Sequence, residues 1–456
     1  MKNDVQAVEG SLYEVRRAIY PRAVHGWFAA WRWALVWATQ IVFYGGAWLE
    51  WNGRQALLFD IANRKFYILG LVFWPQDIIY LTALLIISAL SLFLFTAVAG
   101  RLWCGYACPQ TVYTEIFLWI ERKIEGDRNA RIRLDQEETN SRKILLKAAK
   151  HAAWIALSLW TGFTFVGYFT PIRELLQEIV SFQLGPWEAF WVFFYSFATY
   201  GNAGWMREQV CKYMCPYARF QSAMFDKDTM IITYDRARGE PRGKGEGKGD
   251  CVDCGICVQV CPTGIDIREG LQYECIGCAA CIDGCDQVMD KVGSPRGLIR
   301  YSTTNAMDKG WSRGEMFRRV LRPRVLVYFS ILGAIVLAAG ASLYLRVPLK
   351  VDVIRDRAAI AREVEGELIE NLYRLQIMNT TEQARAFAIE VTGLPGIHIA
   401  GEPITGVPAA SSRLVPVKVH AMAYGTAPGS HPIVFHVRAL GPGGAEVDER
   451  SVFITR

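Results

Sequence analysis

Five long apolar runs restrict this chain to a small set of architectures. They cover residues 27–49, 78–99, 152–169, 187–204 and 325–345, and polar stretches separate them. The hydrocarbon core of a bilayer is about 30 Å thick and takes roughly 20 apolar residues in a helix. Because a backbone in lipid must satisfy its own hydrogen bonds, such runs cross as helices. The pattern predicts an α-helical polytopic membrane protein with about five transmembrane helices.

A shorter apolar run, FYILGLVFW at residues 66–74, lies between the first two of these. It is too brief to span and is followed by Pro75. Aromatic residues gather at the headgroup level of membranes, so we expect an interfacial or re-entrant segment here.

Basic residues are distributed unevenly between the connecting segments. The loop at 100–150 contains ten Lys and Arg residues, whereas the loop at 170–186 contains only Arg173. Cytoplasmic loops beside spans carry the excess of positive charge. We therefore expect a cytoplasmic N-terminal segment at 1–26, a four-span bundle at 27–204, a cytoplasmic segment at 205–324, a last transmembrane helix at 325–345 and an outer domain at 346–456. This topology explains the net charge of +6, and we expect the lipid bilayer and no nucleic acid as a partner.

Eight cysteines stand close together in CVDCGICVQVCPTGIDIREGLQYECIGCAACIDGCD, which contains the pattern CxxCxxCxxxC twice. In two-cluster ferredoxins three cysteines of each run and the last cysteine of the other run hold one [4Fe-4S] cluster. The predicted ligands of the first cluster are Cys251, Cys254, Cys257 and Cys285, and those of the second are Cys275, Cys278, Cys281 and Cys261. We expect a ferredoxin-like α+β domain at about 250–292, inserted in the cytoplasmic segment.

Zinc is the alternative for these thiolates. Zinc sites usually use paired CxxC knuckles with longer spacers, so the doubled motif favours iron-sulfur clusters. Pro262 follows the first run, but Asp286 stands where the second run would have its proline. Clustered soft ligands on the reducing side of the membrane indicate electron transfer.

A second motif occurs twice, as CGYACP from Cys104 and as CKYMCP from Cys211, and each copy follows a predicted span. Proline disfavours a helical conformation in the residue before it, so we expect Cys108 and Cys215 at helix breaks, with the prolines opening the next helices. One hypothesis is that the four CxYxCP cysteines converge in a metal or redox site that binds copper or transfers electrons. The alternative is that they are small buried side chains at helix ends.

The last hundred residues contain segments of alternating apolar and polar residues, separated by Gly, Pro and Ser. This alternation predicts a small antiparallel sandwich of the immunoglobulin type. The stretch from Asp352 to Leu375 suggests a partly helical stalk before it.

The stretches CGYACPQT, CKYMCPYARFQ, the eight-cysteine segment and PRGLIRY together resemble the CcoG family of cytochrome c oxidase accessory proteins, also called FixG or RdxA. The resemblance covers nearly the whole chain. It implies a ferredoxin-like protein of the bacterial inner membrane, with its sandwich in the periplasm. It further implies reduction of Cu(II) to Cu(I), with copper as substrate, for assembly of cbb3-type cytochrome c oxidase.

This resemblance fits a working mechanism. A cytoplasmic donor reduces the clusters, electrons pass toward the CxYxCP cysteines, and copper is reduced near them. Cytochrome oxidase assembly factors are the further partners that the family implies. Two other classes stay open: an electron-relay subunit that feeds a periplasmic reductase or exchanges electrons with quinol, and an iron-sulfur sensor without turnover.

Overall fold

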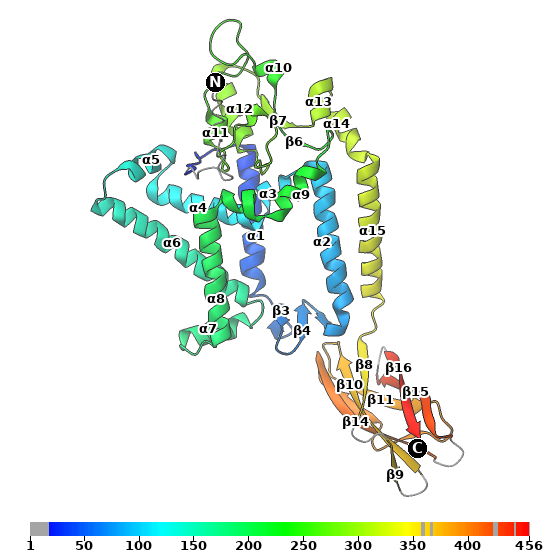
Figure 1. Ribbon diagram of the computed structural model, residues 1–456. Helices are drawn as coiled ribbons and strands as arrows, with labels where there is room; N and C mark the ends of the chain where they lie inside the picture. Colours follow the sequence, from blue (N-terminus) through cyan, green and yellow to red (C-terminus); the bar gives the residue numbers. More distant parts are fainter. Residues whose placement is uncertain (1–17, 357–360, 365–367, 423–426, 442–443, 456) are drawn as a thin grey trace, which may run out of the picture. The chain divides into compact units, whose positions relative to one another are not determined.

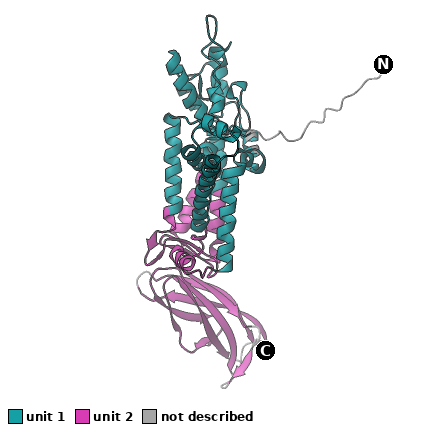
Figure 2. Ribbon diagram, turned by 90° about the vertical axis from the view of Figure 1, so that its left-hand side faces the viewer, with its two compact units in different colours: residues 1–44, 88–165, 185–332 teal, residues 45–87, 166–184, 333–456 magenta. Residues whose placement is uncertain are grey.

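The computed structural model describes residues 18–356, 361–364, 368–422, 427–441 and 444–455 (Figure 1). The chain forms two compact units, and each is built from three separate stretches of sequence (Figure 2). Unit 1 comprises residues 1–44, 88–165 and 185–332, and unit 2 comprises residues 45–87, 166–184 and 333–456.

All five apolar runs contain helices, which are α1 (Trp27–Gly46), α2 (Ile78–Ala99), α6 (Ser141–Val166), α8 (Pro186–Thr199) and α15 (Pro323–Tyr344). In the described part of the chain, two helical stretches are long and apolar enough to cross a membrane, Pro75–Ala99 and Pro323–Tyr344. Almost nothing in the protein covers their apolar side chains, as lipid-facing helices require. Spans at α1, α6 and α8 stay a prediction.

The paired CxYxCP motifs lie in unit 1, on or between α3 (Leu102–Tyr106), α4 (Pro109–Glu125), the π-helical turn η3 (Val210–Met214) and α9 (Pro216–Met224). Helix α5 (Arg128–Gln136) follows the first motif, and the π-helical turn η2 (Tyr200–Met206) precedes the second. Cys108 and Cys215 have extended backbones, and each precedes a proline that begins α4 or α9. The helix breaks predicted at both cysteines are therefore confirmed.

The eight-cysteine segment lies within a small α+β part of unit 1. Its elements are β6 (Ile231–Tyr234), α10 (Arg236–Gly239), α11 (Ile256–Gln259), η4 (Ile267–Glu269), α12 (Ala280–Val292) and β7 (Ile299–Ser302). Strands β6 and β7 pair antiparallel on either side of the cysteines in the sequence, so this part reaches beyond residues 250–292. Helices α13 (Thr304–Lys309), α14 (Arg313–Arg318) and the turn η5 (Arg319–Leu321) lead on to α15.

Unit 2 includes two small sheets between α1 and α2. One contains β1 (Glu50–Trp51) and β2 (Arg54–Gln55), and the other contains β3 (Leu57–Asp60), β4 (Lys65–Ile68) and β5 (Leu71–Phe73). Residues 66–74 are therefore too short to span, as expected, and form part of a sheet; their interfacial or re-entrant position stays a prediction. Leu69 takes a positive φ of 53° before Gly70, and this turn pairs the two halves of the run as a β-hairpin.

The sandwich of unit 2 has two antiparallel sheets, and their facing side chains form its core. One sheet contains β8 (Leu349–Arg355), β9 (Arg362–Val364), β10 (Leu368–Asn379), β12 (His398–Ala400) and β14 (Ser411–Met422); the other contains β11 (Arg385–Thr392), β13 (Ile404–Val407), β15 (Gly429–Ala439) and β16 (Glu446–Thr455). Tyr373, Phe387, Phe435 and Phe453 are fully buried between the sheets. The predicted helical stalk from Asp352 to Leu375 is wrong for its described residues, which lie largely in β8, β9 and β10, and the side chains of β10 are alternately buried. Residues 357–360 and 365–367 of this stretch lie outside the described residues.

A buried carboxylate fixes the beginning of the sandwich within unit 2. Asp77, in the turn η1 (Pro75–Asp77) before α2, contacts Arg346 at 2.7 Å and also Lys350. Its side chain is 3% exposed and accepts the backbone N–H of Trp74 at 3.0 Å. The remaining helix of this unit is α7 (Ile172–Val180).

Candidate functional site

Four cysteines line one small cavity next to α12. They are Cys251, Cys254, Cys257 and Cys285, and the other lining residues are mostly apolar, such as Val288 and Leu298, with Arg268 among them. Cys285 belongs to the second run in sequence but lies with the first run in space. The structure therefore brings together the four thiols expected for the first cluster.

A neighbouring cavity gathers the second set. It is lined by Cys275, Cys278 and Cys281 from the second run and by Cys261 from the first. Cys281 and Cys285 stand four residues apart on α12, so they lie on one face of this helix. Cys257 lines both cavities, so the two groups of thiols adjoin.

The spacing of the sulfur atoms distinguishes a single ion from a cluster of several irons. Among the described residues, no three cysteine sulfur atoms lie within 4.8 Å of one another. A single tetrahedral ion with sulfur ligands at about 2.3 Å needs its sulfurs about 3.8 Å apart. The arrangement thus suits polynuclear clusters better than the zinc alternative.

Burial makes these thiols weak acids. It raises the pKa of Cys257 to about 11 and the pKa values of Cys275 and Cys285 to about 12. Thiols with these pKa values are protonated at neutral pH, and they become thiolates when a bound metal supplies positive charge. Their chemistry therefore fits iron, whose binding would release protons.

The four CxYxCP cysteines also come together. Burial, and after it the neighbouring Cys108, raises the pKa of Cys104 to about 11. Burial, and then Cys108 and Cys104, raises the pKa of Cys211 to about 12, and Cys215 contributes to both shifts. Cys104 and Cys211 pack against one apolar cluster, and Cys108 and Cys215 are near enough to act on their pKa values, although the two motifs are about a hundred residues apart in sequence.

This CxYxCP group lies beside the second set of ferredoxin cysteines. Cys104 and Cys211 pack against the apolar cluster of Val260, Ile276 and Cys278. A Cβ added to Gly105 would lie 2.8 Å from the backbone of Cys278, so α3 approaches this loop as closely as glycine allows. The glycine of CGYACP is the sequence signal for this contact.

Family models match three parts of the chain. A 4Fe-4S binding domain matches residues 81–126 and a 4Fe-4S dicluster domain matches residues 206–304. The immunoglobulin-like fold at the C-terminal end of FixG matches residues 339–456. Every cysteine of the chain falls within the first two matches.

Curated relatives extend the similarity to most of the chain. The nitrogen fixation protein FixG of Rhizobium meliloti is 39% identical over 437 residues, 87% of this chain and 83% of the relative. The protein RdxA of Cereibacter sphaeroides is 40% identical over 434 residues, 92% of each chain. The chain belongs to the FixG/RdxA family. It is an iron-sulfur electron-transfer protein with 4Fe-4S domains and an immunoglobulin-like C-terminal domain.

More distant matches cover parts of this FixG/RdxA family member. The ferredoxin-type protein NapH of Haemophilus influenzae is 26% identical over 223 residues, 46% of this chain and 68% of the relative. The crystal structure of a FixG-related protein from Vibrio parahaemolyticus matches 24% of this chain and 97% of its own, at 24% identity and a TM-score of 0.21.

Two polar residues that the motifs do not reveal hold the cysteine segments in place. Asp283 on α12 accepts the backbone N–H groups of Phe28 at 3.2 Å and Ala29 at 2.7 Å, so it caps the first turn of α1. The buried guanidinium of Arg101 donates to the carbonyls of Tyr273 and Ala218. Arg101 thereby ties α3 to the loop before Cys275 and to α9.

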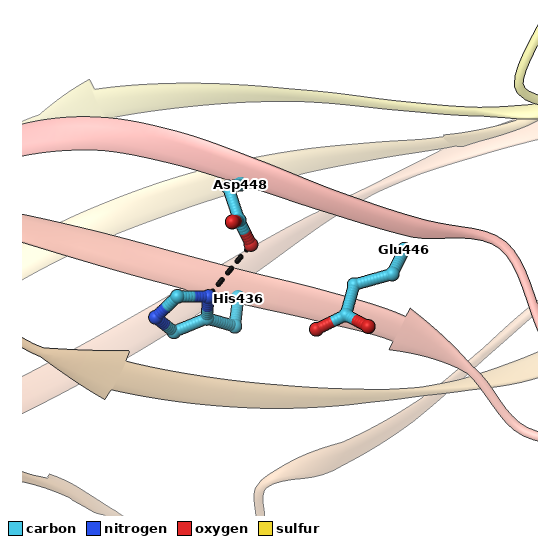
Figure 3. Close-up of side chains that lie close together, drawn as sticks. All are labelled: His436, Glu446 and Asp448. Atoms are coloured by element: carbon cyan, nitrogen blue, oxygen red, sulfur yellow. Dashed lines mark hydrogen bonds and ion pairs between the residues drawn. The ribbon is translucent and has the colours of Figure 1, made fainter.

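A third group of possible ligands lies on the sandwich (Figure 3). His436 and Asp448 are cross-strand partners on β15 and β16, joined at 2.6 Å, and Glu446 lies nearby. The second ring nitrogen of His436 is 2.8 Å from the hydroxyl of Thr392. Since both ring nitrogens have partners and the two acids are exposed, we assign no metal to this group.

Proposed function

We propose that this iron-sulfur protein is a cupric reductase, which converts Cu(II) to Cu(I) for assembly of cbb3-type cytochrome c oxidase. The supporting observation is that Cys104 and Cys211 pack in the same apolar cluster as the ferredoxin cysteine Cys278. A centre formed by the CxYxCP cysteines would therefore adjoin the second cluster.

The residues divide into three groups in this proposal. Cys251, Cys254, Cys257 and Cys285 would hold one [4Fe-4S] cluster, and Cys261, Cys275, Cys278 and Cys281 the other. Such clusters, when bound, supply one-electron transfer. The redox or copper-binding group comprises Cys104, Cys108, Cys211 and Cys215, whose soft sulfurs favour Cu(I).

The protein surroundings suit thiolate chemistry in the CxYxCP group. The side chain of Gln221 is 3.5 Å from the sulfur of Cys104, and Arg101 lowers the pKa values of Cys104 and Cys211 against the larger effect of burial. A fixed positive charge stabilises thiolates, and the approach of a copper ion would add to this effect.

The proposed topology places both groups of cysteines at the cytoplasmic side of the bacterial inner membrane and the sandwich in the periplasm. The ten basic residues of the loop at 100–150 support this orientation. The electron donor is then cytoplasmic. Partners in oxidase assembly would meet the protein in the membrane or at its sandwich.

Anaerobically purified protein would test the reaction directly. Iron and sulfide are quantified, the clusters are reduced chemically, and Cu(II) is titrated while a Cu(I)-specific chelator reports the product. We expect about one Cu(I) for each electron stored in a cluster. The C104A/C108A/C211A/C215A variant should keep its ferredoxin clusters but form Cu(I) at least tenfold more slowly. Fully loaded wild-type protein that leaves Cu(II) unreduced would overturn the proposal.

A further inference from the structure

Cys254 differs from the other cysteines of the chain in its exposure. All twelve lie in the described part of the chain, and Cys254 is the exposed one, whereas its three partners in the first set are buried. Its neighbours Asp253 and Gly255 have left-handed backbones, with φ angles of 52° and 65°. A non-glycine residue in this region is uncommon, and such strain is concentrated at functional sites. The first set therefore reaches solvent at Cys254.

Arg268 holds the loop that exposes Cys254. It is buried, lines the cavity of the first set, and pairs with Asp253 at 2.5 Å and with Asp266 at 2.6 Å. The ion pair offsets the negative charge beside Cys254, because opposite charges in contact cancel most of each other's field at a distance. The carboxylate next to Cys254 is therefore only a weak obstacle to an acidic partner.

A glycine-rich loop borders the first set of cysteines. Residues 241–249 of this loop read PRGKGEGKG. The backbone N–H of Gly243 donates to the carbonyl of Cys251 at 2.8 Å, so the loop contacts a residue of the first set directly. Lys244 and Lys248 are exposed on the loop. Two long cationic side chains therefore lie at the surface beside the first set.

Positive charge predominates on this loop and on α10 before it. Residues 236–250 contain five basic and three acidic side chains. Two of the arginines form ion pairs with acids of the same segment, so the excess lies with Arg236, Lys244 and Lys248 against Glu246. A positive patch attracts an acidic protein over some distance and raises its rate of association.

The second set of cysteines lies in different surroundings. None of its four members is exposed, and Cys278 packs in one apolar cluster with Cys104 and Cys211 of the CxYxCP group. Cys257 lines the cavities of both sets, so an electron has a short route from the first set to the second. Electron transfer slows steeply with distance. The exposed first set is therefore the better entry for electrons, and the buried second set is the better exit toward the CxYxCP group.

We propose that electrons enter at the first cluster, from a small acidic protein that carries one electron at a time and docks on Lys244 and Lys248 beside Cys254. We call these three residues the entry surface. The inference rests on the proposed function, because it names the partner that supplies its electrons. The reduced carrier is oxidised by one electron and the first cluster is reduced by it, and no bond forms or breaks.

Binding and electron transfer to the detergent-solubilised full-length protein test the entry surface. The probe is flavodoxin, an acidic one-electron carrier, and reduced methyl viologen is a small cationic comparator. We expect K244E/K248E to weaken binding of oxidised flavodoxin at least fivefold at low ionic strength, and to slow cluster reduction by reduced flavodoxin to the same extent. High salt should remove both differences, because it screens the charges. Reduction by methyl viologen should not slow in this variant.

K309E/R313E is the matched control for charge reversal. It changes two exposed residues on α13 and α14, which lie outside the loop and line neither cysteine cavity. Flavodoxin binding and reduction rates should stay within twofold of the wild type. Equal losses in the two double variants, or no loss in K244E/K248E, would overturn the docking of an acidic carrier on the lysines.

Variants that lack one cluster test the order of transfer. C275A should keep the first cluster, and flavodoxin should reduce it as rapidly as in the wild type. C251A should keep the second cluster, and its reduction should be at least tenfold slower. Iron and sulfide are measured in every preparation, and rapid reduction of C251A would overturn entry at the first cluster.

The outcomes separate this inference from the proposed function. A protein that passes these tests but leaves Cu(II) unreduced would uphold the entry surface and overturn the cupric reductase. A protein that reduces Cu(II), but whose K244E/K248E variant binds and accepts electrons from flavodoxin as the wild type does, would do the reverse.

Discussion

Individual cysteines show how far sequence spacing can specify a site. The crossed arrangement places Cys261 and Cys285 each with the other run, and their cavities agree with the expectation from the doubled motif. The doubled motif predicts this crossing, because in two-cluster ferredoxins the last cysteine of each CxxCxxCxxxC run binds the cluster of the other run. Asp283 and Arg101 could not be predicted, since their partners lie far away in sequence and depend on how the helices pack.

The crossed assignment makes a prediction for single substitutions. C285A should lose the same cluster as C251A, although Cys285 is closer in sequence to the second run. We expect each variant to lose about four irons and to show the same residual electron paramagnetic resonance spectrum. C275A is the contrasting control. A C285A spectrum that matches C275A would contradict the crossing.

One carboxylate of the sandwich gives a prediction for pH. Its hydrogen bond with His420 at 3.0 Å, assisted by Lys418, lowers the pKa of Glu370. A depressed carboxyl pKa stabilises the fold above the unfolded value, about 4.3 for Glu, and this contribution is lost as pH falls through the folded pKa. We expect E370Q to remove up to about 1 kcal/mol of stability at pH 6 and to flatten the pH dependence. Calorimetry of the full-length protein between pH 3 and 6 measures both; identical profiles would refute the assignment.

Among the elements, helices were predicted more reliably than short strands. The helices in the long apolar runs were predicted because the length and composition of such a run are enough to indicate a helix. The hairpin in the run at 66–74 was not predicted, since its pairing depends on a turn and on β3, which lies outside the run. The described residues of the predicted stalk at 352–375 include parts of the paired strands β8 and β10. Their conformation depends on burial against the sandwich and not on helical periodicity in the sequence.

The cap that α12 provides for α1 leads to a test of that contact. D283A removes both hydrogen bonds to the first turn of α1 and should cost about 1–2 kcal/mol of stability, with faster loss of iron on warming. D290A, on the same helix, removes only an exposed ion pair with Arg296 and should cost less stability than D283A does. Thermal unfolding with iron release measures both variants, and equal effects would show that the cap is unimportant.

The close approach of α3 can be tested in the same way. G105A places a methyl group against the Cys278 backbone, so α3 or the loop must shift, and we expect a changed spectrum of the second cluster. G201A is the control, because nothing lies within 4 Å of its added Cβ. Indistinguishable spectra of G105A and wild type would contradict the tight contact.

At the scale of the whole molecule, the two units divide the loops into the same two sets as the predicted topology does, and the sidedness itself stays a prediction. Unit 2 gathers the loop at 50–77, most of the loop at 170–186 and the C-terminal domain. With a cytoplasmic N-terminus and five spans, the predicted topology puts these three segments on the outer side of the membrane. Unit 1 contains the segments expected in the cytoplasm, with all twelve cysteines. The numbers of Lys and Arg residues in the loops predict which loops share a side of the membrane. They cannot predict which of those loops pack against one another.

Reporter fusions test the orientation. Alkaline phosphatase joined after residue 456 should be active, because it folds in the periplasm. A fluorescent protein inserted after Gly245, in the loop before Cys251, should be fluorescent because the proposed topology puts this loop in the cytoplasm. Exchanging the two reporters should abolish both signals, and the opposite pattern would invert the proposed topology.

The carboxylate of Asp77 has a mechanical consequence. Residues 345–348 are all that separate α15 from β8, and Asp77 joins Arg346 and Lys350 to the start of α2. The sandwich is therefore joined to the ends of two helices, to α15 by the chain itself and to α2 by these ion pairs. A displacement of the first strand of the sandwich is therefore passed to the adjoining ends of both helices.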